Sequence, residues 1–253
     1  NAYTITVATT DVTAAALKTV HEATTVEVTA TAVTKITGSN ADIVNLYTAK
    51  DNSGLNIDGD VILVVTDGGG ITVSQANVLN GKTSGVITAT ISTTDIADLD
   101  DLDNNTGATG NAYTITVSTQ QVNASALNIV NAATTVNVTA TAVTRITGTA
   151  AQLATTYGGG ITGLGNENIV LTDTTLAAAT LTPTVNGYSS VAIDANSVTT
   201  LTGTYDEIDA AYTADNAGTV ILDTDAKLTV SGTITVTEAN ALNGKTSGVI
   251  TAT

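Results

Sequence analysis

Residues 1–38 read NAYTITVATTDVTAAALKTVHEATTVEVTATAVTKITG, and residues 111–148 repeat them as NAYTITVSTQQVNASALNIVNAATTVNVTATAVTRITG. A second pair of copies is ITVSQANVLNGKTSGVITAT at 71–90 and ITVTEANALNGKTSGVITAT at 234–253. The two offsets are 110 and 163 residues, and one repeat of about 27 residues accounts for both, taken four and six times. Repetition on this scale predicts a structure built by stacking similar units.

Each repeat changes from a strand pattern to a helix pattern along its length. It begins with a short alternation of apolar and polar residues, turns through Thr, Ser or Asp, and enters an Ala- and Leu-rich segment. The polar residues before these segments are natural N-caps, since their oxygens accept free amides of the first turn. Helical segments are predicted at 12–20, 93–102, 122–130 and 174–181. Strands are predicted to begin near Tyr3, Val26, Val61, Val86, Tyr113, Val136, Ile169, Val191, Val220 and Val249.

Consecutive parallel strands joined by helical crossovers predict a right-handed coil with a parallel sheet. We therefore expect a repeat solenoid, specifically a parallel β-solenoid with α/β-type repeats of about 27 residues, each a strand plus a short helix. Residues 1–253 are expected to form one continuous solenoid of about nine repeats. The alternative is a three-sided all-β helix, in which the Ala-rich segments are only turns.

The composition suits the narrow interior of such a fold. The sequence has no Phe, Trp, Met or Cys, and its aromatic residues are seven Tyr. Globular cores normally depend on large aromatic side chains for buried area. Val, Ile and Thr instead favour strands and stack well in thin layers. The lack of Cys excludes disulfides and thiolate metal sites.

The charge excludes two classes of partner. With 23 acidic residues against 7 Lys and Arg, the formal net charge is −16. Nucleic acid requires a basic surface to neutralise its phosphates, and an anionic membrane surface requires the same. No apolar run reaches the roughly 18 residues of a transmembrane helix, so we expect no transmembrane segment. Strong acidity suits solubility in a salty exterior or divalent cations as counter-ions, and the alternative is that it only prevents aggregation.

Three stretches carry a family resemblance: TGLGNENIVLTDTTLAAATL at 162–181, SVTTLTGTYDEIDAAY at 197–212 and LNGKTSGVITATISTTDIADLDDL at 79–102. They resemble tandem modules in very large surface proteins of marine cyanobacteria and other aquatic bacteria, and the resemblance covers nearly the whole chain. It implies a giant secreted or cell-surface protein of a surface layer (S-layer), filament, adhesion or motility system. It transfers no catalytic or ligand residues.

The expected partners follow from the repeat pattern at the two ends. Neither end carries an atypical polar cap, which an isolated solenoid needs for solubility. We expect the chain to be cut from, or assembled into, a longer array. Open strand edges would then pair end to end with another copy or with neighbouring repeats of the same protein. A cell-surface polysaccharide is a second candidate partner.

Two acidic stretches are candidate calcium sites. In DNSGLNIDGD at 51–60, the alternating Asn56, Asp58 and Asp60 place several oxygens where they could surround one hard cation, but the bidentate Glu of an EF-hand is missing. In the second stretch, Asp98 and Asp101 lie three apart on a helical turn, where their repulsion would favour a cation, and Asp103 follows. We predict calcium as the only cofactor, with these residues as its ligands.

Two other functions were weighed against a structural one. Paired carboxylates suggest a polysaccharide-cleaving β-helix enzyme, but the chain has a single His, few basic residues and no Trp platform for a sugar. His21 is replaced by Asn131 in the copy, which favours a surface role over catalysis. A Thr-rich solenoid that binds ice or crystal surfaces is the other alternative, although unequal repeat lengths spoil a flat Thr array. We predict a non-enzymatic structural or adhesive module, stabilised by calcium.

Overall fold

The computed structural model describes residues 1–52, 54–103 and 110–252. The chain divides into two compact units. The N-terminal unit comprises Asn1–Val117 with Ile129–Thr139, and the C-terminal unit comprises Ser118–Asn128 with Ala140–Thr253. Both are built of parallel strands that alternate with helices, and neither contains a closed barrel in its described part.

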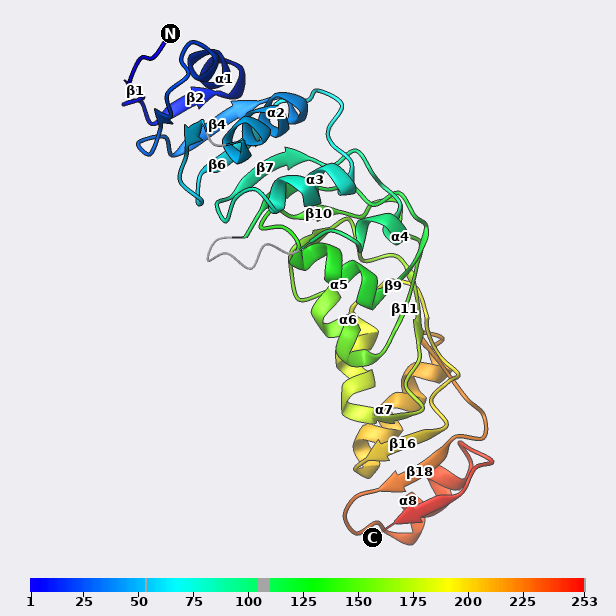
Figure 1. The fold of residues 1–253 in the computed structure, drawn as a ribbon. Coiled ribbons are helices and arrows are strands. Elements are labelled where there is room, and N and C mark those ends of the chain that lie inside the picture. The colour runs from blue at the N-terminus through cyan, green and yellow to red at the C-terminus, as the bar shows by residue number, and fades with distance from the viewer. Residues whose placement is uncertain (53, 104–109, 253) are drawn as a thin grey trace. The chain divides into compact units, whose positions relative to one another are not determined.

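The N-terminal unit has two parallel sheets with helices between their strands (Figure 1). The larger sheet has the order β2 (Asp11–Thr13), β4 (Lys35–Gly38), β6 (Ile62–Val65), β7 (Ile87–Thr90) and β8 (Ala112–Thr114). The smaller has the order β1 (Ile5–Thr6), β3 (Val28–Thr29) and β5 (Leu55–Asn56). The helices are α1 (Ala14–Glu22), α2 (Asn40–Asp51), α3 (Val73–Asn80) and α4 (Ile96–Leu99). Helix α2 packs between α1 and α3.

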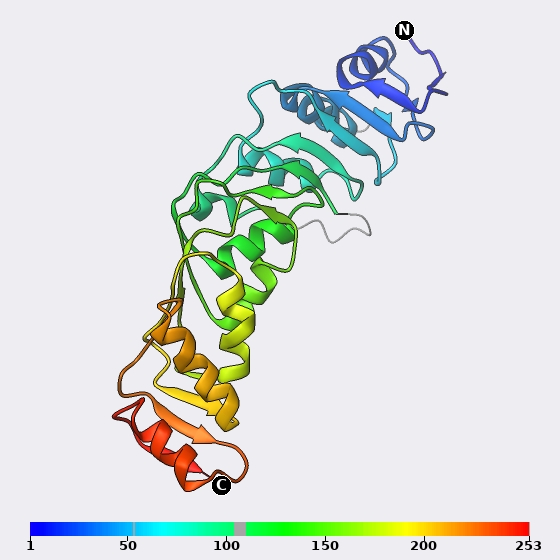
Figure 2. The ribbon, with the colours of Figure 1, turned by 180° about the vertical axis from the view of Figure 1, so that it is seen from behind.

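The C-terminal unit repeats this plan (Figure 2). One sheet has the order β17 (Val220–Leu222), β15 (Ile193–Ala195), β13 (Asn168–Leu171), β11 (Arg145–Gly148) and β9 (Gln121–Asn123). The other has the order β14 (Thr175–Ala177), β16 (Thr200–Gly203), β18 (Lys227–Val230) and β19 (Ile250–Ala252). Its helical elements are α6 (Ala150–Thr156), η1 (Thr180–Thr184), η2 (Val185–Gly187), α7 (Tyr205–Asn216) and α8 (Val236–Asn243). The remaining elements of the chain are α5 (Ala124–Ala132), β10 (Val138–Thr139) and β12 (Ile161–Thr162).

Strand register places equivalent apolar residues of successive repeats side by side. Ile36 pairs with Leu63, and Leu63 pairs with Ile87, and all three are fully buried. In the C-terminal unit Leu201 pairs with Leu228 in the same way. Each repeat alone has too little apolar area to fold, so this ladder of buried side chains is what stabilises the sheets.

Threonine begins most of the helices. Thr72, Thr149, Thr204 and Thr235 each form a capping box, in which the N-cap hydroxyl accepts the N3 amide and the N3 Gln or Glu accepts the N-cap amide. Among the predicted Ala-rich segments, the N-cap role is confirmed at two, where Thr13 and Asp95 each accept a backbone amide of the first turn of α1 and α4.

The sequence predictions of strands and helices hold with two exceptions. A strand lies within a few residues of each of the ten predicted starts, and helices form over three of the four predicted segments. The prediction of a helix at 174–181 is only partly correct, because Thr175–Ala177 forms β14, whose Leu176 pairs with Leu201, and helical backbone begins at Ala178 and continues into η1. The all-β alternative is also wrong, since α2 and α7 each run for 12 residues.

Candidate functional site

At five places in the chain, the hydroxyl of a Thr or Ser joins one repeat to the one before it. The side chain of one Thr or Ser donates a hydrogen bond of 2.6–2.7 Å to a backbone carbonyl 20–22 residues earlier. The same oxygen accepts the backbone N–H two residues further on. We call these residues the linking hydroxyls: Thr24, Thr83, Thr134, Ser189 and Thr246.

A glycine lets the backbones of two repeats approach at two of these joints. A Cβ on Gly85 would lie 2.2 Å from the carbonyl oxygen of Asp60, and one on Gly248 would lie 2.3 Å from that of Asp225. No side chain fits there, so these glycines are required for close approach of the backbone. The sequence signal is a pair of hydroxyl residues before an apolar strand start, which our sequence analysis did not identify.

A lysine next to two of the linking hydroxyls reaches back to a carboxylate of an earlier helix. Lys82 pairs with Asp51 at 2.9 Å, and its counterpart Lys245 pairs with Asp209 at 2.9 Å. Both carboxylates are well exposed, so each pair contributes little stability, on the order of 0–1 kcal/mol. The pairs repeat the geometry of the joint in both units.

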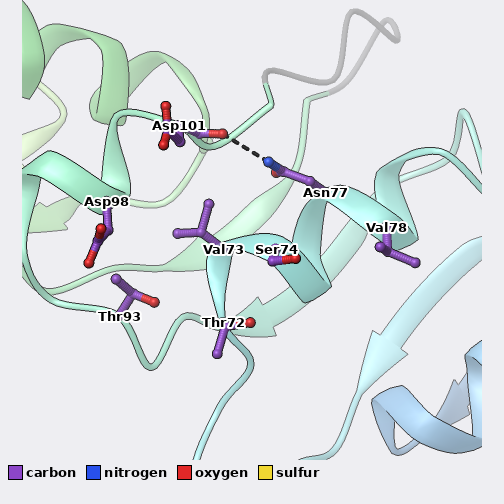
Figure 3. Close-up of a pocket in the computed structure, with 8 residues that line it drawn as sticks. All are labelled: Thr72, Val73, Ser74, Asn77, Val78, Thr93, Asp98 and Asp101. Atoms are coloured by element: carbon purple, nitrogen blue, oxygen red, sulfur yellow. Dashed lines mark hydrogen bonds between the residues drawn. The ribbon is translucent and has the colours of Figure 1, made fainter.

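An open pocket of about 630 Å³ in the N-terminal unit contains two of the predicted calcium ligands (Figure 3). It is lined by Thr72, Val73, Ser74, Asn77, Val78, Thr93, Asp98 and Asp101. The carboxyl groups of Asp98 and Asp101 stand apart in it rather than meeting at one point. The amide of Asn77 donates a 2.8 Å hydrogen bond to the backbone oxygen of Asp101. The pocket surface is acidic and hydroxyl-rich, which suits a cation or a polar neutral molecule better than an anion.

The side chains of the other predicted ligands are exposed to solvent. Asp103 does not line the pocket, and its N–H donates to the Asn77 side chain at 2.9 Å. Asn56 ends β5, and Asp58 and Asp60 follow it, all with exposed side chains. In the described ranges, no group of three or more His, Asp or Glu side chains is arranged to hold a metal ion. Calcium at these residues therefore stays a prediction.

The structure also shows the surroundings of three other polar residues of the two copies. His21 is half-buried against Gly54 rather than freely exposed, and its Nδ1 has no hydrogen-bond partner in the described part of the chain. Lys35 pairs with Asp11 of the neighbouring strand at 2.5 Å. In the copy, Arg145 lies beside Gln121 instead.

One exposed carboxyl of the C-terminal unit is affected by its neighbour. The protonated Asp225 carboxyl donates a hydrogen bond to Asp223, and this bond together with the negative charge of Asp223 raises the pKa of Asp225.

Glu167 is a buried carboxylate that the sequence analysis did not single out. The Tyr157 hydroxyl donates to it at 2.8 Å, and the Gly165 N–H lies 2.9 Å from both of its oxygens. Burial, followed by the Glu167 contact, raises the pKa of Tyr157. The Tyr157 ring stacks on Tyr188 with centroids 4.7 Å apart. Since its oxygens are used to close the turn at Gly165, Glu167 has a structural role in the GLGNE motif.

None of the described helices combines the length and apolarity that crossing a membrane requires. Comparisons of the chain with protein-family models, with curated proteins and with solved structures find no match. The function must therefore be argued from the residues themselves.

Proposed function

We propose that this chain is an extracellular structural or adhesive repeat module, part of a cell-surface filament, surface layer or giant adhesin, and that it is not an enzyme. The proposal rests on the kinds of residue that recur from one repeat to the next. The recurring residues are strand-pairing apolar residues, helix caps, linking hydroxyls and the lysines beside them. The strand pairs, the linking hydroxyls and the lysines hold one repeat on the next, and the caps begin the helix within a repeat. A catalytic site instead needs different residues that converge on one point.

The proposal includes a single continuous solenoid over residues 1–253, of the kind that the resemblance to giant bacterial surface proteins implies. Parallel pairs between successive repeats within each unit support it. In such an array each repeat is stabilised by its neighbours, so unfolding spreads from one repeat to the next. A continuous solenoid predicts one cooperative denaturant transition. Two well-separated transitions would contradict it.

The strand register gives the ice-binding alternative only a short row of threonines. Successive hydrogen-bonded positions lie 22, 24, 25 or 27 residues apart, depending on the repeat. Thr202, Thr229 and Thr251 do lie side by side on β16, β18 and β19. The row does not continue through the N-terminal unit, where Val64 lies between Thr37 and Thr88.

Immunogold labelling tests the proposed location and role. Antibodies against the purified chain are expected to label extended structures on the surface of intact cells of the organism that makes it. Labelling that requires permeabilised cells would contradict the proposal. Cells that lack the gene serve as the control.

Calcium is retained as a counter-ion of Asn56, Asp58 and Asp60 and of Asp98, Asp101 and Asp103. Binding to the folded state alone would raise the melting temperature, because ligand binding shifts the folding equilibrium. Thermal melts with EDTA and with excess calcium are the measurement. An unchanged midpoint would refute calcium binding without affecting the structural proposal.

A further inference from the structure

Two tyrosines of the C-terminal unit lie face to face where one repeat packs on the next. Tyr157 ends helix α6, Tyr188 follows η2, and these two elements pack together. The ring centroids are 4.7 Å apart and the ring planes are 2° from parallel. Both residues are half-buried, so the pair is not sealed from small molecules in the solvent.

The hydroxyl of Tyr157 is bonded to a proton acceptor. It donates a 2.8 Å hydrogen bond to Glu167, which is fully buried and also accepts the Gly165 N–H at 2.9 Å. Burial, and then the contact with Glu167, raises the pKa of Tyr157, so the phenol keeps its proton at any ordinary pH. A phenol that loses an electron becomes a far stronger acid than a carboxylic acid. Its proton then passes along the existing hydrogen bond to Glu167, which makes Tyr157 easier to oxidise.

The same helix position carries a tyrosine in two other repeats. Helices α2 and α7 have the buried Tyr47 and Tyr212 eight residues after the N-cap, as α6 has Tyr157. The Tyr47 hydroxyl has no hydrogen-bond partner in the described residues. Among those residues the stacked tyrosine pair is that of Tyr157 and Tyr188. A Tyr at this position therefore packs without a carboxylate or a second ring, and packing alone does not explain why Tyr157 has both.

We propose that Tyr157 and Tyr188 form an oxidative cross-linking site, at which a haem peroxidase using hydrogen peroxide joins two successive repeats through a dityrosine bond. The chain has no Cys, Met or Trp, so no disulfide can fasten its repeats and none of those side chains competes for the oxidant. This modification goes beyond the proposed structural function. A covalent tie between repeats would strengthen a module that works outside the cell.

The reaction balances in atoms and electrons. Each phenol loses one electron and its hydroxyl proton, that of Tyr157 passing to Glu167, and becomes a phenoxyl radical. Tyr188 tilts out of the parallel stack, and a carbon–carbon bond forms between the two ring carbons next to the oxygens. Those carbons release their hydrogens as protons, and each oxygen is protonated again, at Tyr157 by Glu167. The two electrons and two protons lost overall reduce one hydrogen peroxide to two waters.

Equimolar hydrogen peroxide and a haem peroxidase test the site on the purified chain, since one peroxide supplies one cross-link. Peptide mass spectrometry is expected to show Tyr157 joined to Tyr188 with the loss of two hydrogens, and dityrosine fluorescence should appear. The bond joins residues 31 positions apart and restricts the unfolded chain. The unfolding equilibrium constant, measured in denaturant, should therefore fall on the order of a hundredfold.

Four variants separate the site from general tyrosine oxidation. Tyr157→Phe and Tyr188→Phe keep the stacked rings but remove one phenol each, so both should lose the cross-link. Tyr212→Phe is the matched control, because it removes a phenol from the same helix position in α7, and it should cross-link like the wild type. Glu167→Gln removes the proton acceptor and should slow cross-linking about a hundredfold. Circular dichroism checks the folding of each variant, and the Phe variants decide the outcome if Glu167→Gln does not fold.

Dityrosine that joins other residues or separate molecules, with Tyr157 and Tyr188 left unlinked, would overturn the proposed site. An unchanged dityrosine yield in Tyr188→Phe would do the same, and an unchanged rate in folded Glu167→Gln would overturn the role of Glu167. Failure to cross-link leaves the structural function standing if immunogold still labels the cell surface. If the chain cross-links but labels only the cell interior, the proposed surface location fails and the site stands.

Discussion

Residues 1–38 and 111–148 have nearly the same sequence, and residues 11–38 have the same local structure as 121–148, yet their side chains have different surroundings. Strand β2 and helix α1 recur 110 residues later as β9 and α5. Burial does not recur: Tyr3 is 56% exposed and Tyr113 is 1% exposed, because only Tyr113 lies on a strand paired with a preceding repeat. Local structure therefore depends on the segment, whereas burial depends on its neighbour.

The second pair of copies, 71–90 and 234–253, also shares its local structure and differs in burial. Helices α3 and α8 share the capping box and the following glycine. Val73 is 8% exposed in the first copy, and Val236 is 79% exposed in the second. The linking hydroxyls Thr83 and Thr246 make the same bonds in both copies, because their partners belong to the repeat before, which both copies have.

The largest contrast is expected between the two tyrosines. Tyr113→Ala removes a buried ring and should lower the free energy of unfolding by about 4 kcal/mol. Tyr3→Ala should change it by less than about 0.5 kcal/mol, since exposed substitutions are usually near neutral. Denaturant unfolding of the two variants measures both effects. Equal losses would show that the comparison of burial is wrong.

Burial also predicts an alkaline loss of stability. It raises the pKa of Tyr47 from 10.0 to about 12. Above pH 10 the unfolded chain ionises at this residue while the folded chain stays neutral, so stability falls by about 3 kcal/mol between pH 10 and 12. Melting curves against pH measure the loss.

Tyr47→Phe is the control for this prediction. This variant should lack the part of the alkaline stability loss that comes from Tyr47. Its free energy of unfolding at pH 7 should change little, because the Tyr47 hydroxyl has no hydrogen-bond partner in the described residues. An unchanged pH profile in this variant would assign the alkaline loss to other groups.

At the linking hydroxyls the two copies 71–90 and 234–253 are expected to lose the same stability on substitution. Thr83→Val and Thr246→Val each remove two hydrogen bonds at nearly constant volume, and each should destabilise its own repeat by about 2 kcal/mol. Hydrogen exchange of the amides in β7 and β19 measures the local effect. Thr83→Ser and Thr246→Ser keep the hydroxyl and should lose less. A loss confined to one copy would contradict the shared role.

The smallest effect is expected at the helix caps. Thr72→Ala and Thr235→Ala each remove an N-cap acceptor and should destabilise α3 and α8 by about 1 kcal/mol. Exchange rates of the first-turn amides provide the measurement, with Thr→Ser at the same positions as control. If α8 alone responds, packing rather than capping stabilises α3.

Much of the fold could be predicted because its signals are local. The alternating residues at 86–90 predict a strand, and Thr followed by Ala at 13–14 predicts the start of a helix. Neither prediction needs any other part of the chain. The segment at 174–181 misled because its Ala-rich composition favours a helix, while pairing of Leu176 with Leu201 imposes a strand. Propensity yields to tertiary pairing in such short segments.

The candidate site was less predictable. Asp98 and Asp101 were expected to share a face, and both line one pocket, but Asp103 was expected with them and its N–H instead bonds Asn77. The linking hydroxyls were missed because their partners are backbone atoms, which leave no trace in residue types. The signal available was a hydroxyl pair that precedes five of the ten predicted strand starts. Glu167 was missed because its burial beside Tyr157 depends on the fold.

The sequence by itself determined the repeat, the order of strand and helix within it, the caps and the acidic surface, because each depends on residues near one another in the chain. Only the tertiary structure decided which side chains are buried, which backbone carbonyls the linking hydroxyls reach and which strand edges stay open. Those properties depend on the neighbouring repeat. Tyr3 and Tyr113 occupy identical positions in the repeat and differ only in whether that neighbour is present.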